Sequence, residues 1–407
     1  MKRVFKIIPC LFIILLVAAC SKPTDDKDIQ IKKTKIEIIE MDNNILEINV
    51  ASPKYQSDKL EVWDFSSCKE LQGNVRQLVL PNMHPQLYYT NDGYVYYEDE
   101  EDGWKKWLVG KDKTIISYDY DIITMKNQDG SLNEYCFDDD SGNLFSVKSQ
   151  FSADEFVQTK GQALAFDEPH KAMDRIYKQN GKLYYQEGYF DELSDIEQKN
   201  EFLVKLGEKT LPIEAFNCDD QAFNFIRSGN MLIPIEARND IEIENNKAFL
   251  EVDENVKIDN VEHFFGMPLM SVCVSEINDK QNLWLYDVPV AGIGETEKEA
   301  KISLPKQYTT DDIKKCYVGI IPSEKDPHDM CLITEFNDGT FYKTSYSDIN
   351  SQQYKIAGVT YQMEKILTIS ENVDADHVKD VYVDSSSGSR FQIYLLMDDG
   401  YVYELKY

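Results

Sequence analysis

The stretch LLMDDGYVY at Leu395–Tyr403 carries the pattern that decides the fold. An apolar segment runs into an Asp-Asp-Gly turn, one variable residue follows, and then come an apolar residue and a tyrosine. Glycine and asparagine tolerate the positive φ that tight hairpin turns require. Asx-Gly between two apolar segments therefore predicts a β-hairpin.

The same pattern occurs three more times along the chain. It reads YYTNDGYVY at Tyr88–Tyr96, IYKQNGKLY at Ile176–Tyr184 and ITEFNDGTFY at Ile333–Tyr342. Further turn signals lie at Asp129-Gly130, Ser141-Gly142 and Asn245-Asn246. The hairpins form a weak internal repeat with an irregular spacing of about 40–60 residues or a multiple of it, which is typical of four-stranded propeller blades. The sequence therefore predicts an all-β protein.

The repeated hairpins resemble the blade hairpins of bacterial β-propeller proteins. They are similar to the propellers of low-density-lipoprotein-receptor-like proteins and of bacterial surface lipoproteins of unknown function. The resemblance implies one β-propeller of about 6–8 four-stranded blades, spanning residues 34–407. The chain lacks the Trp-Asp and Trp-Gly blade endings and the Ser-x-Asp-x-Gly box of named propeller families. A two-sheet sandwich with insertions is the alternative.

The chain ends and the few helical patterns complete the predicted architecture. In propellers one terminus often completes the blade begun by the other, which removes an open sheet edge. We therefore expect the last strand, Gly400–Tyr407, to pair with a strand from the hairpin predicted over Ile36–Val50. Short helices are predicted at Ser152–Val157, within Leu193–Leu203 and, from an N-cap pattern, at Thr309–Ile313.

The first twenty residues have the organisation of an export signal. Lysines and an arginine precede a short apolar run that ends in Val17-Ala18-Ala19-Cys20. This end resembles the bacterial lipobox, which implies that residues 1–19 are cleaved and that Cys20 carries a diacylglycerol. Residues 20–33 are polar and suit a flexible tether. The prediction is a lipoprotein on the extracytoplasmic face of a cell membrane, and the alternative is an ordinary cleaved signal peptide.

The charge of the chain limits its partners. Lysine and arginine number 43 against 72 aspartates and glutamates, which gives a net charge of −29. Nucleic acid is an unsuitable partner because phosphate binding needs a basic surface. The same acidity would repel anionic lipid heads, so the lipid anchor rather than surface charge should hold the protein at a membrane. Cations or cationic ligands fit better, unless the acidity serves solubility alone.

The candidate metal ligands are oxygens. Asp138, Asp140 and Asn143 lie in one tight turn and could bind calcium, which prefers such oxygen atoms. The run departs from the EF-hand loop at its glycine and at its twelfth position, and a solvated acidic hairpin is the competing interpretation. The histidines lie far apart in sequence and show no zinc-type spacing. They are His84, His170, His263, His328 and His377.

Cysteines and aromatic residues are predicted to be mainly structural. Cys136, Cys273 and Cys331 lie in strand-like contexts, where cysteine behaves as a small buried apolar residue. Cys316 and Cys331 are the candidate disulfide pair. Trp104 and Trp107 could stack on sugars if they are exposed, or they could fill the space between blades.

No catalytic motif is recognisable in the sequence. The Gly-x-Ser-x-Gly motif is absent, and only five arginines follow the leader, too few for an arginine-rich anion site. The predicted function is a binding or scaffold module for a protein, peptide or glycan. The alternative is a propeller-type hydrolase or lyase of extracellular polysaccharide, whose carboxylates would converge at the central channel.

Overall fold

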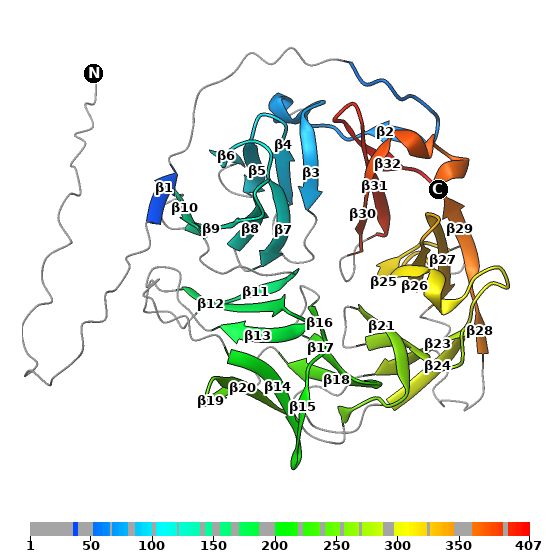
Figure 1. Cartoon of the computed structure of the whole chain (residues 1–407). Helices are drawn as coiled ribbons and strands as arrows, with labels where there is room; N and C mark the ends of the chain where they lie inside the picture. The colour runs from blue at the N-terminus through cyan, green and yellow to red at the C-terminus, as the bar shows by residue number, and fades with distance from the viewer. Residues whose placement is uncertain are drawn as a thin grey trace, which may run out of the picture.

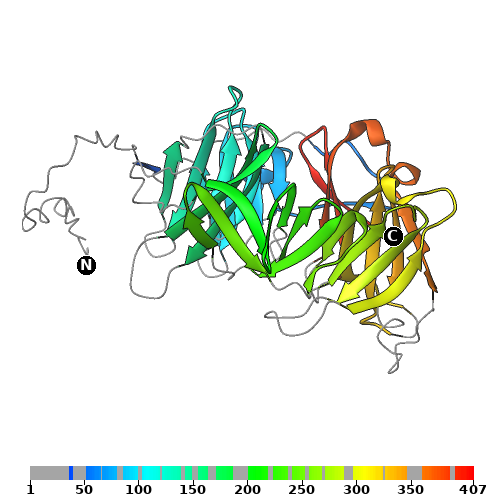
Figure 2. The same cartoon turned by 60° about the horizontal axis from the view of Figure 1, so that its bottom comes forward.

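The chain folds into a ring of small β-sheets, which Figure 1 shows along its axis and Figure 2 from a lower angle. The computed structural model describes residues 36–39, 52–65, 67–79, 86–99, 103–119, 122–138, 143–148, 155–163, 171–186, 200–218, 223–236, 241–252, 256–267, 271–287, 297–323, 326–345, 360–385 and 390–407. The strands of these residues form seven sheets, of which six have at least four strands and one has three. The ring confirms the predicted β-propeller, and the sandwich alternative is wrong.

The sheets are named here blades 1 to 7 in chain order, and the strands of a blade are A to D from the centre outward. Blade 1 contains β3 (Val75–Val79), β4 (Leu87–Thr90), β5 (Tyr94–Asp99) and β6 (Gly103–Leu108). Blade 2 contains β7 (Thr114–Asp119), β8 (Ile122–Lys126), β9 (Leu132–Asp138) and β10 (Asn143–Lys148), with β1 (Ile36–Ile39) at its outer edge.

Blades 3 and 4 are the irregular part of the ring. Blade 3 contains β11 (Glu155–Ala163), β12 (Lys171–Gln179), β13 (Lys182–Gln186) and β14 (Asn200–Leu206), with β15 (Lys209–Pro212) paired to β14. Blade 4 contains β16 (Ala215–Cys218), β17 (Phe223–Ser228) and β18 (Met231–Glu236). A hairpin of β19 (Ile241–Glu244) and β20 (Lys247–Val252) leaves blade 4 and extends blade 3 through a parallel β14–β20 pairing.

Blades 5 to 7 complete the ring. Blade 5 contains β21 (Val261–Met267), β22 (Ser271–Glu276), β23 (Asn282–Asp287) and β24 (Glu297–Ser303), extended by β28 (Thr360–Gln362). Blade 6 contains β25 (Ile313–Ile320), β26 (Met330–Phe336), β27 (Thr340–Ser345) and β29 (Glu364–Thr368). Blade 7 contains β30 (Val378–Asp384), β31 (Gln392–Met397), β32 (Val402–Leu405) and β2 (Leu60–Val62).

The predicted Tyr-rich hairpins occupy one equivalent place in the ring. They are β4–β5, β12–β13, β26–β27 and β31–β32, and each joins strand B to strand C of its blade. Tyr96 and Tyr403 near their ends are buried. The repeat therefore exists because each blade must bury both faces of its inner strands against two neighbours.

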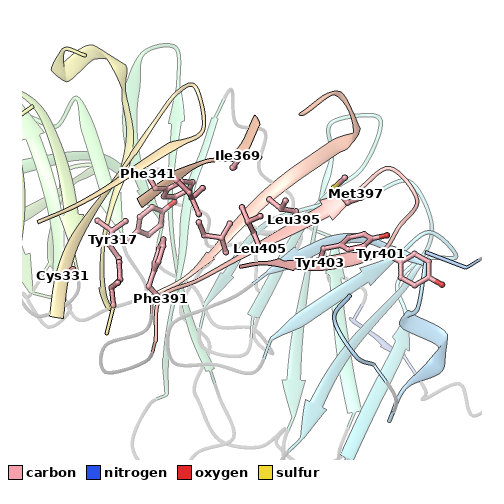
Figure 3. Close-up of a cluster of buried hydrophobic side chains, with 14 residues drawn as sticks. Tyr317, Cys331, Phe341, Ile369, Phe391, Leu395, Met397, Tyr401, Tyr403 and Leu405 are labelled. Atoms are coloured by element: carbon pink, nitrogen blue, oxygen red, sulfur yellow. The ribbon is translucent and has the colours of Figure 1, made fainter. Parts of the chain in front are cut away.

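Apolar clusters fill the spaces between neighbouring blades. The cluster between blades 6 and 7 joins Phe341 and Ile333 of one sheet to Phe391, Leu395 and others of the next. Figure 3 shows Phe341 and Phe391 facing each other between the two sheets. Similar clusters join blade 7 to blade 1, blade 1 to blade 2, blade 3 to blade 4, blade 4 to blade 5 and blade 5 to blade 6. Burial between sheets is the main source of stability of the ring.

A strand near the start of the chain closes the last blade. β2 pairs antiparallel with β32, with Leu60 opposite Leu405 and Val62 opposite Tyr403. Closure by the N-terminal part of the chain is therefore as predicted, but the predicted segment was wrong. Ile36–Ile39 forms β1, which pairs with β10 of blade 2 instead. The remainder of the hairpin predicted over 36–50 lies outside the described residues.

A β-bulge recurs at the second or third residue of strand A. The register of strand A with strand B skips one residue in six blades: Arg76, Ile116, Val157, Glu262, Lys314 and Lys379. A bulge leaves its extra residue unpaired and changes the direction of the neighbouring side chains. The start of each of these strands can thus present two consecutive side chains on one side.

Helical structure is limited to single 3-10 turns in the described part of the chain. They are Lys69–Leu71, Thr310–Asp312, Ile369–Glu371 and Ala375–His377. Thr309 caps the second of them, as predicted, through a capping box with Asp312. The other two helix predictions were wrong where they can be checked, because Glu155–Ala163 and Asn200–Leu206 are strands. Among the described residues, no helix has the length and apolar character needed to cross a membrane.

Candidate functional site

Among the described residues, the B–C turns and the D–A loops lie on one face of the ring, which is called the turn face here. In an antiparallel sheet of four strands, the B–C turn and the connection to the next blade fall at the same end of the strands. Backbone hydrogen bonds join them: the N–H of Asn337 donates to the carbonyl of Asp312 (2.8 Å), and the N–H of Asp398 donates to that of His377 (2.9 Å). Blades 1 and 5 repeat this bond, so the turns are fixed to the loops over the four adjoining blades 5, 6, 7 and 1.

Carboxylates in the B–C turns stabilise these turns directly. Asp129, Asp338 and Asp399 each accept a hydrogen bond from the backbone N–H two residues ahead, at 2.9–3.0 Å. This is the local bond that makes Asp favourable in turns. One oxygen of each side chain is thereby fixed, which holds negative charge in place at the surface.

The turn face of blades 6, 7 and 1 is strongly acidic, and its carboxylates are called the acidic arc. The arc consists of Asp338, Glu371, Asp374, Asp376, Asp398, Asp399, Asp64, Glu70 and Asp92. The cations of the same described loops and strand ends are Lys54, Lys69, Arg76, Lys365 and Lys379, and Arg76 forms an ion pair with Asp112, outside the arc. The negative field of the arc therefore exceeds what its own cations neutralise, which favours cationic partners.

At the centre of the acidic arc, the incoming chain is bonded to blade 7. Tyr55 donates its hydroxyl proton to Asp398 Oδ1 (2.7 Å), and His377 Nδ1 lies 3.1 Å from Asp398 Oδ2. The Tyr55 hydroxyl and the His377 ring lower the pKa of Asp398. Desolvation and the Asp398 carboxylate raise the pKa of Tyr55 to about 12. Tyr55, His377 and Asp398 thus form a fixed polar contact in which the Asp398 carboxylate is ionised at neutral pH.

A second polar cluster lies where blade 5 meets blade 6. His263 Nε2 lies 2.9 Å from Asp311 Oδ1, and Lys280 binds the other oxygen of Asp311. Lys280 Nζ also lies 3.9 Å from Glu262 Oε1. The hydrogen bonds from Lys280 and His263 lower the pKa of Asp311. Sequence reasoning missed this cluster because 48 residues separate the histidine from the aspartate.

The structure tests little of the predicted calcium and lipid sites. Asp138 and Asn143 are opposite one another in the β9–β10 register, at the C–D turn of blade 2 and away from the turn face. Asp140 lies outside the described residues, as does Cys20. Calcium at Asp138, Asp140 and Asn143 and a lipid on Cys20 therefore stay predictions.

Of the histidines, His263 and His377 belong to the clusters above, His328 lies in the A–B loop of blade 6, and the other two lie outside the described residues.

The predicted Cys316–Cys331 disulfide is wrong. Both cysteines are free thiols, and they belong to clusters on opposite sides of blade 6. Cys316 instead contacts Cys273 of blade 5, and this hydrogen bond together with burial raises the pKa of Cys273 well above that of an ordinary thiol. Strand positions for Cys136, Cys273 and Cys331 are confirmed.

The tryptophans serve packing. Trp107 is buried between blades 1 and 2 and stacks on Tyr97 with ring centroids 5.1 Å apart. Trp104 is half-buried and donates its ring N–H to Ser67 (2.8 Å). This matches the structural interpretation of these residues rather than a sugar-stacking one.

Comparisons with known proteins find similar solved structures but no family. No protein-family model matches the chain, and no curated protein matches it either. Among solved structures it is similar to the β-propeller domain of Cps50 (Swd1) from Myceliophteria thermophila, with 10% identity, a TM-score of 0.43 and coverage of 82% of this chain and 98% of that one. It is also similar to Sqt1 of Saccharomyces cerevisiae, with 11% identity, a TM-score of 0.34 and coverage of 82% and 96%.

Proposed function

We propose that the chain is a lipid-anchored extracytoplasmic β-propeller whose acidic arc binds a cationic segment of a partner protein. The observation that carries the proposal is the acidic arc itself, a fixed surface of carboxylates over three adjoining blades. Electrostatic complementarity of this kind steers association and selects partners. The lipid on Cys20 would keep this surface at the membrane.

The rigidity of the turn face supports a binding role. Because the turn carboxylates are already ordered by backbone N–H groups, a partner would not have to order them on binding. Propeller blades packed on both sides give these turns a firm base. The arc therefore suits an extended basic peptide better than a small ligand that needs an enclosed pocket.

The polysaccharide hydrolase or lyase alternative required carboxylates that converge in the central channel. Among the residues described, the buried carboxylates are Glu134 in blade 2 and Asp329 and Glu335 in blade 6. Glu335 accepts hydrogen bonds from Tyr317 (2.6 Å) and Lys314 (2.8 Å), and Asp329 accepts one from Ser345 (2.8 Å). These bonds give Asp329 and Glu335 structural roles, so the geometry favours binding over catalysis.

Neutralising the acidic arc should weaken the binding of a cationic peptide. We expect the triple variant Asp64→Asn, Asp338→Asn and Asp376→Asn to bind an oligolysine peptide about tenfold more weakly, since exposed charge pairs contribute roughly 0.5 kcal/mol each. Fluorescence anisotropy at low and physiological salt would measure this, and the difference should shrink as salt rises.

The matched control removes the same charge from the outer edge of blade 3. Glu208→Gln, Glu242→Gln and Glu244→Gln alter exposed carboxylates far from the arc in the ring. This variant should keep the peptide affinity of the unaltered protein within twofold. Equal losses in both triple variants would mean that net charge, and not the arc, attracts the peptide.

Replacing Cys20 should release the protein from the membrane. The Cys20→Ala chain has no thiol to alkylate, and a single uncleaved apolar leader is not equivalent to several acyl chains. We expect mass spectrometry to find a diacylated N-terminal cysteine in the unaltered protein and no lipid in the variant. An unaltered protein with a free Cys20 thiol would exclude lipid anchoring at this residue.

A further inference from the structure

We propose that Glu262, His263 and Asp311 form a binding site for a divalent transition-metal ion, with Zn²⁺ as the ion to test. One ligand atom from each of these residues can be chosen so that all three lie within 4.8 Å of one another. The site is on the turn face where blade 5 meets blade 6, outside the acidic arc. It does not depend on the proposed function.

The β-bulge of strand A brings two of the ligands together. Successive residues of a regular strand point to opposite faces of the sheet, so Glu262 and His263 would diverge. The register of β21 skips Glu262, and this change of direction is what a bulge produces. The bulge is held in place because Ser275 Oγ accepts the His263 N–H (3.0 Å) and Arg227 donates to the Glu262 carbonyl (2.8 Å).

Asp311 is positioned independently by the D–A loop that enters blade 6. Thr309 donates its N–H (2.7 Å) and hydroxyl proton (2.8 Å) to Asp312, which fixes the 3-10 turn that contains Asp311. The Thr310 N–H also donates to the Lys280 carbonyl (3.0 Å). All three ligands are therefore carried by ordered backbone, as a metal site requires.

Blade 5 has a carboxylate at the bulge position, where blades 2 and 3 have the apolar residues Ile116 and Val157 and three further blades have a cation. The corresponding residues of blades 1, 6 and 7 are cations: Arg76, Lys314 and Lys379. Arg76 forms an ion pair with Asp112 (3.1 Å) of the next D–A loop, and Lys314 forms one with Glu335 (2.8 Å). In blade 5 a carboxylate takes this position and faces a second carboxylate, so the site lacks the strand A cation that blades 1, 6 and 7 carry.

The donor set fits a borderline metal such as zinc. One imidazole nitrogen and two carboxylate oxygens are common zinc ligands, with bonds of about 2.0–2.2 Å. The ligand atoms around a tetrahedral ion lie about 3.4 Å from one another. Small rotations of the three side chains can bring their ligand atoms to this separation. Glu262 Oε2 is a buried oxygen without a hydrogen-bond partner, and an unsatisfied carboxylate oxygen is what an incoming cation would complete.

Lys280 is the competitor for this site. Its ammonium now lies between the two carboxylates, 47% exposed on a flexible stem at the B–C turn. A divalent ion would displace it, and the ammonium would move into solvent without disturbing the core. The exchange replaces one positive charge by two beside two carboxylates, so the local charge becomes balanced.

Calorimetric titration of Zn²⁺ into the metal-free full chain should show one site. Glu262→Gln and His263→Gln, which keep side-chain size, should each lower the affinity at least about tenfold, since even indirect partners of metal ligands contribute 10–100-fold. Lys280→Met should raise the affinity several-fold because it removes the competing ammonium. A gain of affinity cannot arise from misfolding, so this variant keeps the test informative.

His377→Gln is the matched control. His377 is also a turn-face histidine beside aspartates, 3.1 Å from Asp398 and 3.9 Å from Asp374, but it completes no three-ligand group. Its variant should bind Zn²⁺ like the unaltered chain, and circular dichroism should show that all variants fold. The proposal is overturned if the unaltered chain shows no saturable site, if Glu262→Gln and His263→Gln keep full affinity, or if Lys280→Met gains none.

Discussion

Replacing Gly400 with alanine is expected to destabilise the protein by about 2–5 kcal/mol. Gly400 has a φ of +79°, which costs a residue with a Cβ roughly 1–2 kcal/mol. A Cβ at this position would also lie 2.5 Å from the carbonyl oxygen of Gly73, which belongs to the loop entering blade 1. Backbone cannot yield as a side chain can, so overpacking adds about 1–3 kcal/mol.

Gly130→Ala is the control that separates the two costs. Gly130 has a similar φ of +82° in the B–C turn of blade 2, but a Cβ there meets nothing within 4 Å. Its alanine variant should therefore lose only the conformational part, about 1–2 kcal/mol. Urea denaturation of the three proteins measures both values. Equal losses at the two glycines would show that the close approach of blade 7 to blade 1 is not tightly packed.

Disrupting the closing strand should lower the stability by about 4 kcal/mol or more. Leu60 and Val62 of β2 pack against the cluster between blades 6 and 7, in which Leu405 and Tyr403 are buried. The double variant Leu60→Asp and Val62→Asp would replace this apolar contact by two carboxylates that must stay solvated. We expect β2 to detach and the edge of β32 to become exposed.

The neighbouring residue of the same strand provides the control. Glu61 is largely exposed and forms an ion pair with Lys406 (3.0 Å) across the strand pair. Glu61→Ala should cost less than about 1 kcal/mol because exposed pairs contribute little. Differential scanning calorimetry measures the melting temperature of the double variant and of Glu61→Ala. If the double variant has the same melting temperature as Glu61→Ala, β2 does not stabilise the ring.

The hairpins could be predicted from sequence because their signal is local. Asx-Gly turns such as Asp398–Gly400 specify their conformation through the residues of the turn itself. The pairing of Leu60–Val62 with β32 could not be predicted, because a strand of three residues carries little pattern and its partner lies more than 300 residues away. The stronger apolar pattern at Ile36–Ile39 indicated a closing strand that is in fact paired with blade 2.

Tertiary pairing also explains the wrong helices. The segment after Ser152 has a helix-like start, but Glu155–Ala163 pairs along most of its length with β12. Such pairing overrides a weak local propensity.

The acidic character of the surface was evident from composition. The acidic arc and the Glu262–His263–Asp311 cluster depend on which loops the ring brings together, and no local pattern encodes that.

The order of synthesis has a consequence for how this protein matures. Blade 7 contains residues 60–62 and 402–405, and blade 5 is extended by residues 360–362. A ribosome releases the N-terminal part first, so the circle cannot close before residues 402–405 have been made. Until then β2 lacks its partner strand β32, and the ring stays open.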